Sequence, residues 1–172
     1  MSATCHDTQD HVELKPEFVA HADELISHYP VSKRSASLPL LHFWQETHGY
    51  ISNQAVEWIA GKLGLNPIQI LELVTFYPMF RQHPAGKFQI KVCRTLSCQL
   101  GGAYELREHF MKKLGITKVD EHGLGISADG KFSVEFVECL ASCGTAPVIM
   151  VNDDFYEGVS HTQADELIGK YS

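Results

Sequence analysis

Hydrophobic residues recur at helical spacing through most of the first half of the chain. Between Pro16 and Pro30 the apolar positions lie three or four residues apart, which predicts a helix that ends before Pro30. The same spacing predicts three further helices, at about 35–48, 51–64 and 66–77. Four short, closely spaced helices indicate a small helical bundle.

The second half alternates apolar strand-like runs with helical segments. We expect strands at about 88–92, 132–138, 147–151 and 155–158, and helices at about 102–114 and 161–171. This order is compatible with a mixed sheet covered by helices, as in a thioredoxin-like fold. The stretch 81–87 contains Pro and Gly and is typical of a linker. The predicted class is therefore α+β, with an N-terminal helical domain (1–84) followed by a thioredoxin-like α/β domain (85–172).

Composition and charge exclude several kinds of function. The 172 residues are 44% apolar and 20% charged, an ordinary globular balance. A net charge of -7 argues against nucleic-acid binding, which needs a basic surface. No apolar run is long enough to insert into a bilayer, and the polar N-terminus does not resemble a secretory signal. We therefore expect a cytoplasmic, reducing location, where paired cysteines are more often metal ligands or catalytic thiols than disulfides.

Four of the five cysteines form two pairs, and each pair follows a predicted strand. Cys93 and Cys98 are spaced C-x4-C, and Cys139 and Cys143 are spaced C-x3-C. The strand before each pair makes both loops part of one sheet. We therefore expect a metal centre at an end of the sheet, near the surface.

Several chemistries suit four thiols. A [2Fe–2S] centre takes two thiolates per iron, and each tight loop could supply one pair. Zinc sites usually have C-x2-C pairs, and thiol–disulfide exchange prefers C-x-x-C at a helix N-terminus, so both are less favoured by these spacings. Buried, unrelated thiols are the remaining alternative. Small neighbouring residues leave backbone N–H groups free to point at sulfur, and three leucines could partly shield the centre from water: Leu96, Leu100 and Leu140.

Other residues invite a functional interpretation less strongly. Cys5 is expected to be a spare surface thiol. The ten histidines lack the i, i+4 spacing of a helical metal site. The aromatic residues Phe76, Tyr77 and Phe80 could form a docking surface, but we favour core packing.

The chain resembles a known family at these residues: the thioredoxin-like [2Fe–2S] ferredoxin subunit of the NADH-dehydrogenase module of respiratory complex I. Related diaphorase subunits occur in NAD-linked hydrogenases and formate dehydrogenases. The resemblance extends from about Phe18 to Tyr171. In the first half it rests on Lys33-Arg34-Ser35-Ala36, His48-Gly49-Tyr50-Ile51 and Thr75-Phe76-Tyr77-Pro78-Met79-Phe80. In the second half it rests on Val92-Cys93-x4-Cys98-Gln99-Leu100-x-Gly102, Glu138-Cys139-Leu140-x-x-Cys143, Ala146-Pro147 and Val151-Asn152-Asp153.

The resemblance implies a cofactor and a set of partners. Cys93, Cys98, Cys139 and Cys143 would ligate one binuclear cluster, which would exchange single electrons with the FMN of a larger flavoprotein subunit that also binds NADH. The chain has no nucleotide-binding glycine loop, so NADH and FMN are assigned to that partner. The parent assembly would be an NADH:quinone oxidoreductase, a hydrogenase or a formate dehydrogenase, with this chain placed peripherally on the cytoplasmic side.

Position 141 departs from the family pattern. It is Ala where the family usually has Gly. A positive φ would strain an alanine there, and we expect an ordinary negative φ instead.

Overall fold

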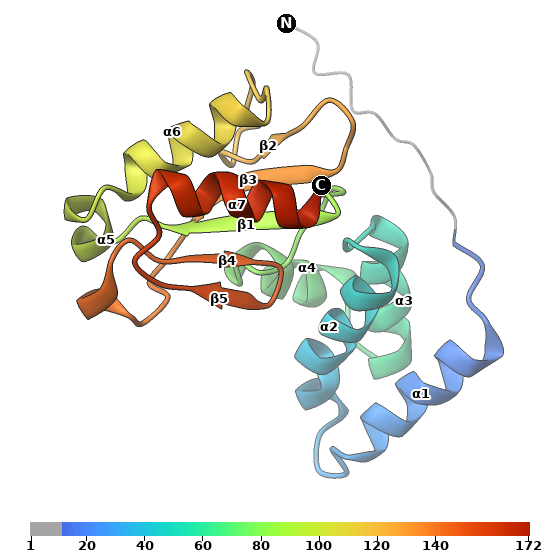
Figure 1. The fold of residues 1–172 in the computed structure, drawn as a ribbon. Helices are drawn as coiled ribbons and strands as arrows, with labels where there is room; N and C mark the ends of the chain where they lie inside the picture. The colour runs from blue at the N-terminus through green and yellow to red at the C-terminus, as the bar shows by residue number, and fades with distance from the viewer. Residues whose placement is uncertain (1–11) are drawn as a thin grey trace, which may run out of the picture. The chain divides into compact units, whose positions relative to one another are not determined.

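A computed structural model describes residues 12–172 of the chain; Cys5 lies outside them. The chain divides into two compact units, Met1–Pro84 and Ala85–Ser172 (Figure 1). Each unit has its own hydrophobic core. Within the described part, no helix is long and apolar enough to cross a membrane.

The N-terminal unit contains the four predicted helices. They are α1 (Pro16–Ser27), α2 (Ser37–His48), α3 (Asn53–Leu63) and α4 (Pro67–Phe76), with a short 3-10 turn, η1 (Lys33–Ala36), before α2. The helices end where the sequence predicts, because Gly49 and Gly64 adopt left-handed conformations as C-terminal caps. Their apolar faces meet in a core whose largest fully buried side chains are Trp44, Leu40, Leu41, Ile59 and Ile70.

The aromatic residues after α4 do not all pack into this core. Phe80 is buried and Tyr77 packs partly against the core, but Phe76 is 76% exposed. The buried face of α4 carries Ile70 and Val74. Phe76 is two positions beyond Val74, so it lies on the opposite side of the helix. Core packing is therefore the wrong interpretation for Phe76.

The C-terminal unit is built on a five-stranded mixed sheet in the order β2-β3-β1-β4-β5. The strands are β1 (Phe88–Cys93), β2 (Gly125–Ile126), β3 (Phe132–Val137), β4 (Ile149–Val151) and β5 (Asp154–Tyr156). The two central strands, β1 and β3, are parallel, and the other pairs are antiparallel. The sequence misses β2 because a two-residue strand has no readable alternation.

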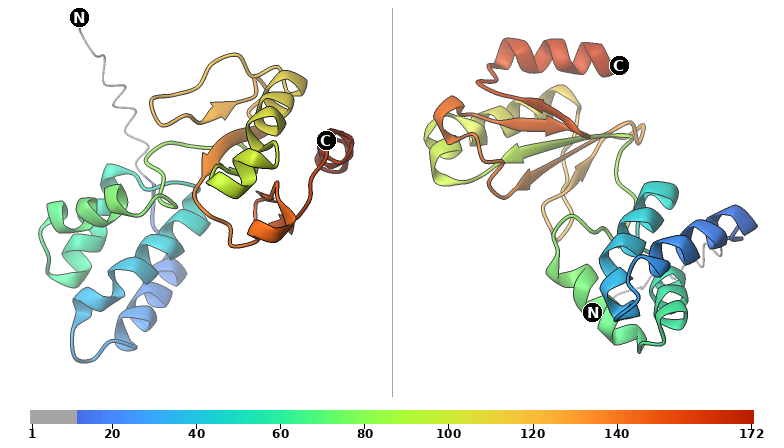
Figure 2. Two further views of the ribbon diagram at one scale, coloured as in Figure 1. Left: turned by 90° about the vertical axis from the view of Figure 1, so that its left-hand side faces the viewer. Right: turned by 90° about the horizontal axis from the view of Figure 1, so that it is seen from below.

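Helices complete this unit as a thioredoxin-like α/β layer structure. The helices are α5 (Leu96–Leu100), α6 (Ala103–Lys113) and α7 (His161–Tyr171). α6 packs on β1 and β3 and lies beside α7 (Figure 2). On β1 the buried residues Ile90 and Val92 alternate with half-buried polar ones, so one face of the sheet supplies most of the core.

Candidate metal centre

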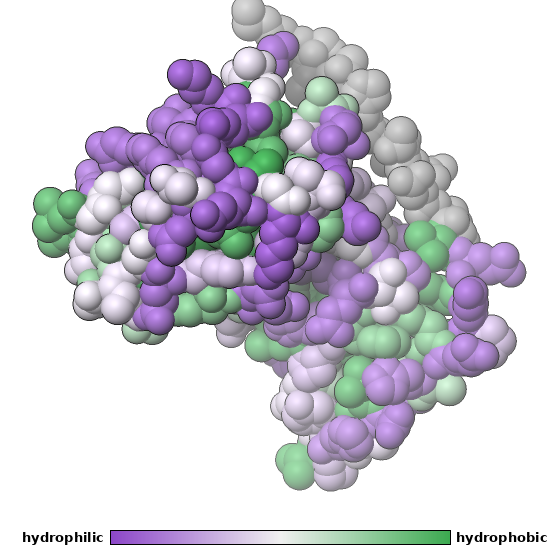
Figure 3. Space-filling view, in the orientation of Figure 1, coloured by the Kyte–Doolittle hydropathy of each residue, from purple (hydrophilic) through white to green (hydrophobic). Residues whose placement is uncertain are grey.

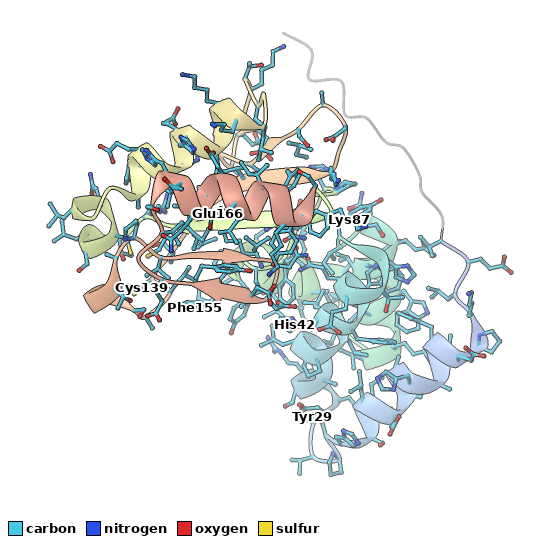
Figure 4. The ribbon with its side chains drawn as sticks, viewed as in Figure 1. Tyr29, His42, Lys87, Cys139, Phe155 and Glu166 are labelled. Atoms are coloured by element: carbon cyan, nitrogen blue, oxygen red, sulfur yellow. The ribbon has the colours of Figure 1, made fainter. Side chains whose placement is uncertain are left out.

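The parallel pairing of β1 and β3 brings both cysteine loops to one edge of the sheet. Cys93 is the last residue of β1 and lies opposite Val137, the last residue of β3. The chain continues from these two positions into the two cysteine loops. Just beyond the strands, the Arg94 N–H donates to the Val137 carbonyl oxygen at 3.0 Å. In Figure 4, Cys139 lies at the same end of the sheet as α5. The expected position, at a sheet end, is thus where the structure places both pairs.

An ion pair joins the two loops across this edge. The Arg94 guanidinium contacts the Glu138 carboxylate, with Nε 3.0 Å from Oε1. Arg94 directly follows Cys93, and Glu138 directly precedes Cys139. Sequence reasoning missed this pair, although its signal was present: two opposite charges flank two candidate ligands at the ends of paired strands.

The first pair is built into the core. Cys93 and Cys98 are each 1% exposed. The segment that carries Cys98, expected to be a loop, forms the short helix α5, closed by a hydrogen bond from the Gln99 N–H to the Thr95 oxygen. Five residues are too few for a readable helical period, which explains why the sequence did not predict α5. The helical turn brings Cys98 back beside Cys93.

Hydrogen bonds make the two buried thiols unequal. Burial opposes ionisation of Cys93, but the Thr95 hydroxyl, 3.3 Å from Sγ, together with the backbone N–H groups of Thr95 and Leu140, lowers the pKa of Cys93. Burial raises the pKa of Cys98, as does its hydrogen bond to Cys93, while the Val148 N–H acts in the opposite direction. Cys93 is therefore the more readily ionised thiol of the pair, and Cys98 donates to it.

The second pair lies on an exposed loop with a left-handed residue in it. Cys139 and Cys143 are exposed; Cys143 begins the 3-10 turn η2 (Cys143–Thr145). Between them, Ala141 has a φ of 64°. The expectation of a negative φ at Ala141 is therefore wrong. In this conformation the Ala141 N–H donates to Cys139 Sγ at 3.3 Å. The left-handed conformation strains Ala141, and it is also the conformation that points the Ala141 N–H at the Cys139 sulfur.

The donor set fits an iron–sulfur centre. The structure brings four thiols to one sheet edge: the Ala141 N–H donates to Cys139 Sγ at 3.3 Å, and the backbone N–H groups of Leu140 and Val148 act to lower the pKa of Cys93 and Cys98. Thiolates with N–H···S hydrogen bonds are the environment in which proteins hold such centres. In residues 12–172, no three His, Cys, Asp or Glu side chains are gathered around a point that could hold a single metal ion.

The three leucines expected to shield the site differ. Leu140 packs partly against the core of its unit. Leu96 and Leu100 are 70% and 81% exposed. Figure 3 shows hydrophobic atoms protruding over α5. In the chain by itself, these two side chains therefore face solvent, and the shielding role expected for them from the sequence is not seen.

Comparisons with known proteins agree with this chemistry. A family model described as "Thioredoxin-like [2Fe-2S] ferredoxin" matches residues 22–172. NADH-quinone oxidoreductase subunit 2 of Thermus thermophilus is 39% identical over 148 residues, covering 85% of this chain and 79% of the relative. A corresponding NADH-quinone oxidoreductase subunit of Rickettsia felis is 39% identical over 153 residues, covering 88% and 89%.

A solved structure supports the fold. A chain of an NAD+-reducing [NiFe]-hydrogenase, in the air-oxidized state, superposes with a TM-score of 0.64 at 22% identity. The match covers 77% of the present chain but only 22% of the hydrogenase chain. At this level of identity the likeness concerns the fold.

Proposed function

Because the chain belongs to the thioredoxin-like [2Fe–2S] ferredoxin family, we propose that it is a one-electron carrier subunit of an NADH:quinone oxidoreductase. The observation that carries the proposal is the shared sheet edge, where two parallel strands deliver two cysteine pairs and their N–H donors. The relatives named NADH-quinone oxidoreductase subunits support the parent complex.

We assign Cys93, Cys98, Cys139 and Cys143 as the four ligands, one pair to each iron. When bound, the cluster supplies a one-electron redox couple. The neighbouring residues of the chain position the four thiolates and supply the hydrogen-bond donors around them. The N–H groups of Leu140, Val148 and Ala141 stabilise negative charge on sulfur. Exposure of Cys139 and Cys143 leaves one side of the site accessible to a redox partner.

The partner that fits this role is a flavoprotein subunit that binds NADH and FMN. The present chain would exchange electrons with that flavin and have no substrate site of its own. The whole module would lie peripherally on the cytoplasmic side of a membrane complex. A diaphorase module of an NAD-linked hydrogenase is the alternative parent, suggested by the shared fold. Identification of the subunits that co-purify with the chain distinguishes the two.

The experiment that tests the cofactor and its ligands is spectroscopic. The purified protein should be brown and, after reduction with dithionite, give the EPR signal of a [2Fe–2S] centre. Replacing any one of the four assigned cysteines by Ser should lower iron content or shift the spectrum, whereas Cys5→Ser serves as the control and should change neither. A colourless protein with one zinc per chain would refute the proposal, and a normal spectrum for Cys139→Ser would refute the ligand assignment.

A further inference from the structure

The second cysteine loop has a support that does not come from the hydrophobic core. The loop carries the exposed thiols Cys139 and Cys143 and the strained Ala141. Cys93 and Cys98 are themselves buried in the core, but the residues between Ala141 and Thr145 are exposed or half-buried. Leu140 and Ala146, on either side of this segment, pack partly against the core, and the contacts of the segment itself are polar.

Glu157 makes the central contacts. It follows β5 directly, and a single carboxylate oxygen, Oε1, accepts hydrogen bonds from the hydroxyls of Ser142 and Thr145, the latter at 2.6 Å. These two hydroxyl oxygens are themselves 2.8 Å apart. The hydrogen bonds from Ser142 and then Thr145 lower the pKa of Glu157, because both stabilise the ionised carboxylate.

Ser142 and Thr145 bracket a predicted ligand. Ser142 directly precedes Cys143, and Thr145 ends the 3-10 turn that Cys143 begins. The turn is closed by a hydrogen bond from the Thr145 backbone N–H to the Ser142 carbonyl oxygen at 3.2 Å. One carboxylate oxygen therefore holds both ends of the turn that positions the Cys143 thiol.

The backbone provides a separate connection between the same two segments. The Gly158 N–H donates to the Thr145 oxygen at 2.7 Å, and the Val159 N–H donates to the Pro147 oxygen at 3.1 Å. These bonds do not involve the Glu157 side chain. A substitution at Glu157 should therefore leave the fold intact while loosening the turn.

We propose that Glu157 is a positioning residue for the iron–sulfur site, acting through a hydrogen-bonded clamp on Ser142 and Thr145 that holds Cys143 in place for metal binding. This inference rests on the proposed function, because it assumes that Cys143 is a ligand. When a residue that orients a metal ligand without binding the metal is removed, metal affinity or activity typically falls by about 10–100-fold.

Two substitutions at Glu157 distinguish the loss of its hydrogen-bond acceptor from the loss of its negative charge. Glu157→Ala removes the acceptor, so release of the cluster to an iron chelator, followed by loss of visible absorbance in the full-length protein, should accelerate by roughly tenfold or more. Glu157→Gln keeps an amide oxygen that can accept both hydroxyls and should release the cluster at close to the wild-type rate. Glu166→Ala, an exposed glutamate on α7, is the matched control and should behave as wild type.

A second measurement uses the protein without its cluster. Amide hydrogen exchange at the Thr145 N–H should be faster in Glu157→Ala than in wild type and unchanged in Glu157→Gln. The double variant Ser142→Ala/Thr145→Val should reproduce both effects of Glu157→Ala.

The proposed role of Glu157 is refuted if Glu157→Ala matches wild type in both measurements. It is also refuted if Glu157→Gln releases the cluster as fast as Glu157→Ala does. Wild-type protein that binds no cluster would instead refute the proposed function, and the exchange experiment would still report on the clamp.

Discussion

Ala141 offers a direct test of the strain in the second cysteine loop. Its φ of 64° places an alanine in the left-handed region. That conformation costs a residue with a Cβ about 1–2 kcal/mol relative to the right-handed one. Glycine avoids this cost in the folded state, but it gives the unfolded chain more freedom, which offsets about 0.4–1 kcal/mol. The Ala141→Gly variant should therefore be more stable by about 0.5–1 kcal/mol.

The change is measurable as a shift in melting temperature of the cluster-free protein. For a domain of 60–100 residues, about 1 kcal/mol shifts Tm by about 4–8 °C, so we expect a rise of about 2–8 °C in the transition of the C-terminal unit. Scanning calorimetry measures this shift. Trp44 and Trp58 are the only tryptophans and both lie in the N-terminal unit, so their fluorescence provides an internal reference.

A second alanine in the same unit provides the control. Ala128 is exposed and has an ordinary negative φ, so Ala128→Gly should show only the unfolded-state effect and lower Tm. If Ala141→Gly lowers Tm as much as Ala128→Gly does, the left-handed conformation of Ala141 carries no strain and the reasoning is refuted.

Two further substitutions test the structure of the C-terminal unit away from the cysteines. A Cβ at Gly86 would lie 2.3 Å from the backbone carbon of Phe132, so Gly86→Ala should destabilise the unit by about 1–3 kcal/mol in urea unfolding. Gly169→Ala, with open space on α7, should have no such effect, and equal stability of the two variants would contradict this packing. The hydrogen bond to Asp154, with smaller contributions from neighbouring groups, raises the pKa of Tyr171 to about 12, above the ordinary value of about 10. Because the folded state holds this proton more tightly, its contribution to stability should be present below pH 10 and be lost between about pH 10 and 12. Thermal melts of Tyr171→Phe should show a smaller loss over that range, and an unchanged alkaline profile would rule out the contribution of Tyr171.

The sequence predicts the elements whose hydrophobic period is long enough to read. The helix α3 follows from its apolar stripe and its Ser52 cap, whose side chain accepts from the Ala55 N–H. The strands before the two cysteine pairs follow from short runs of apolar residues bounded by turns. In contrast, α5 and β2 are too short to have a period, and only contacts with the rest of the sheet fix them.

The position of the two cysteine pairs at one end of the sheet was predictable from the sequence, but the backbone conformation of their loops was not. Spacing and flanking strands indicate which cysteines belong together, because parallel strands end at a common edge. The φ of Ala141 could not be predicted, since it depends on the path that the loop takes to direct an N–H group at Cys139. The role of Glu157 was hidden for a similar reason: it lies 14 positions after Cys143 and meets the loop only through the fold.

The two halves of the site are therefore stabilised by different physical means. Burial in the core fixes Cys93 and Cys98, so their geometry should persist as long as the unit is folded. The loop of Cys139 and Cys143 has Leu140 partly packed against the core and is otherwise held by hydrogen bonds on the surface, each of which contributes only about 0.5–1.5 kcal/mol net. Local opening should then be easier in the second loop than in the first. The two thiols of the second loop are also the exposed ones, so the part of the candidate site that opens more easily is the part that faces solvent.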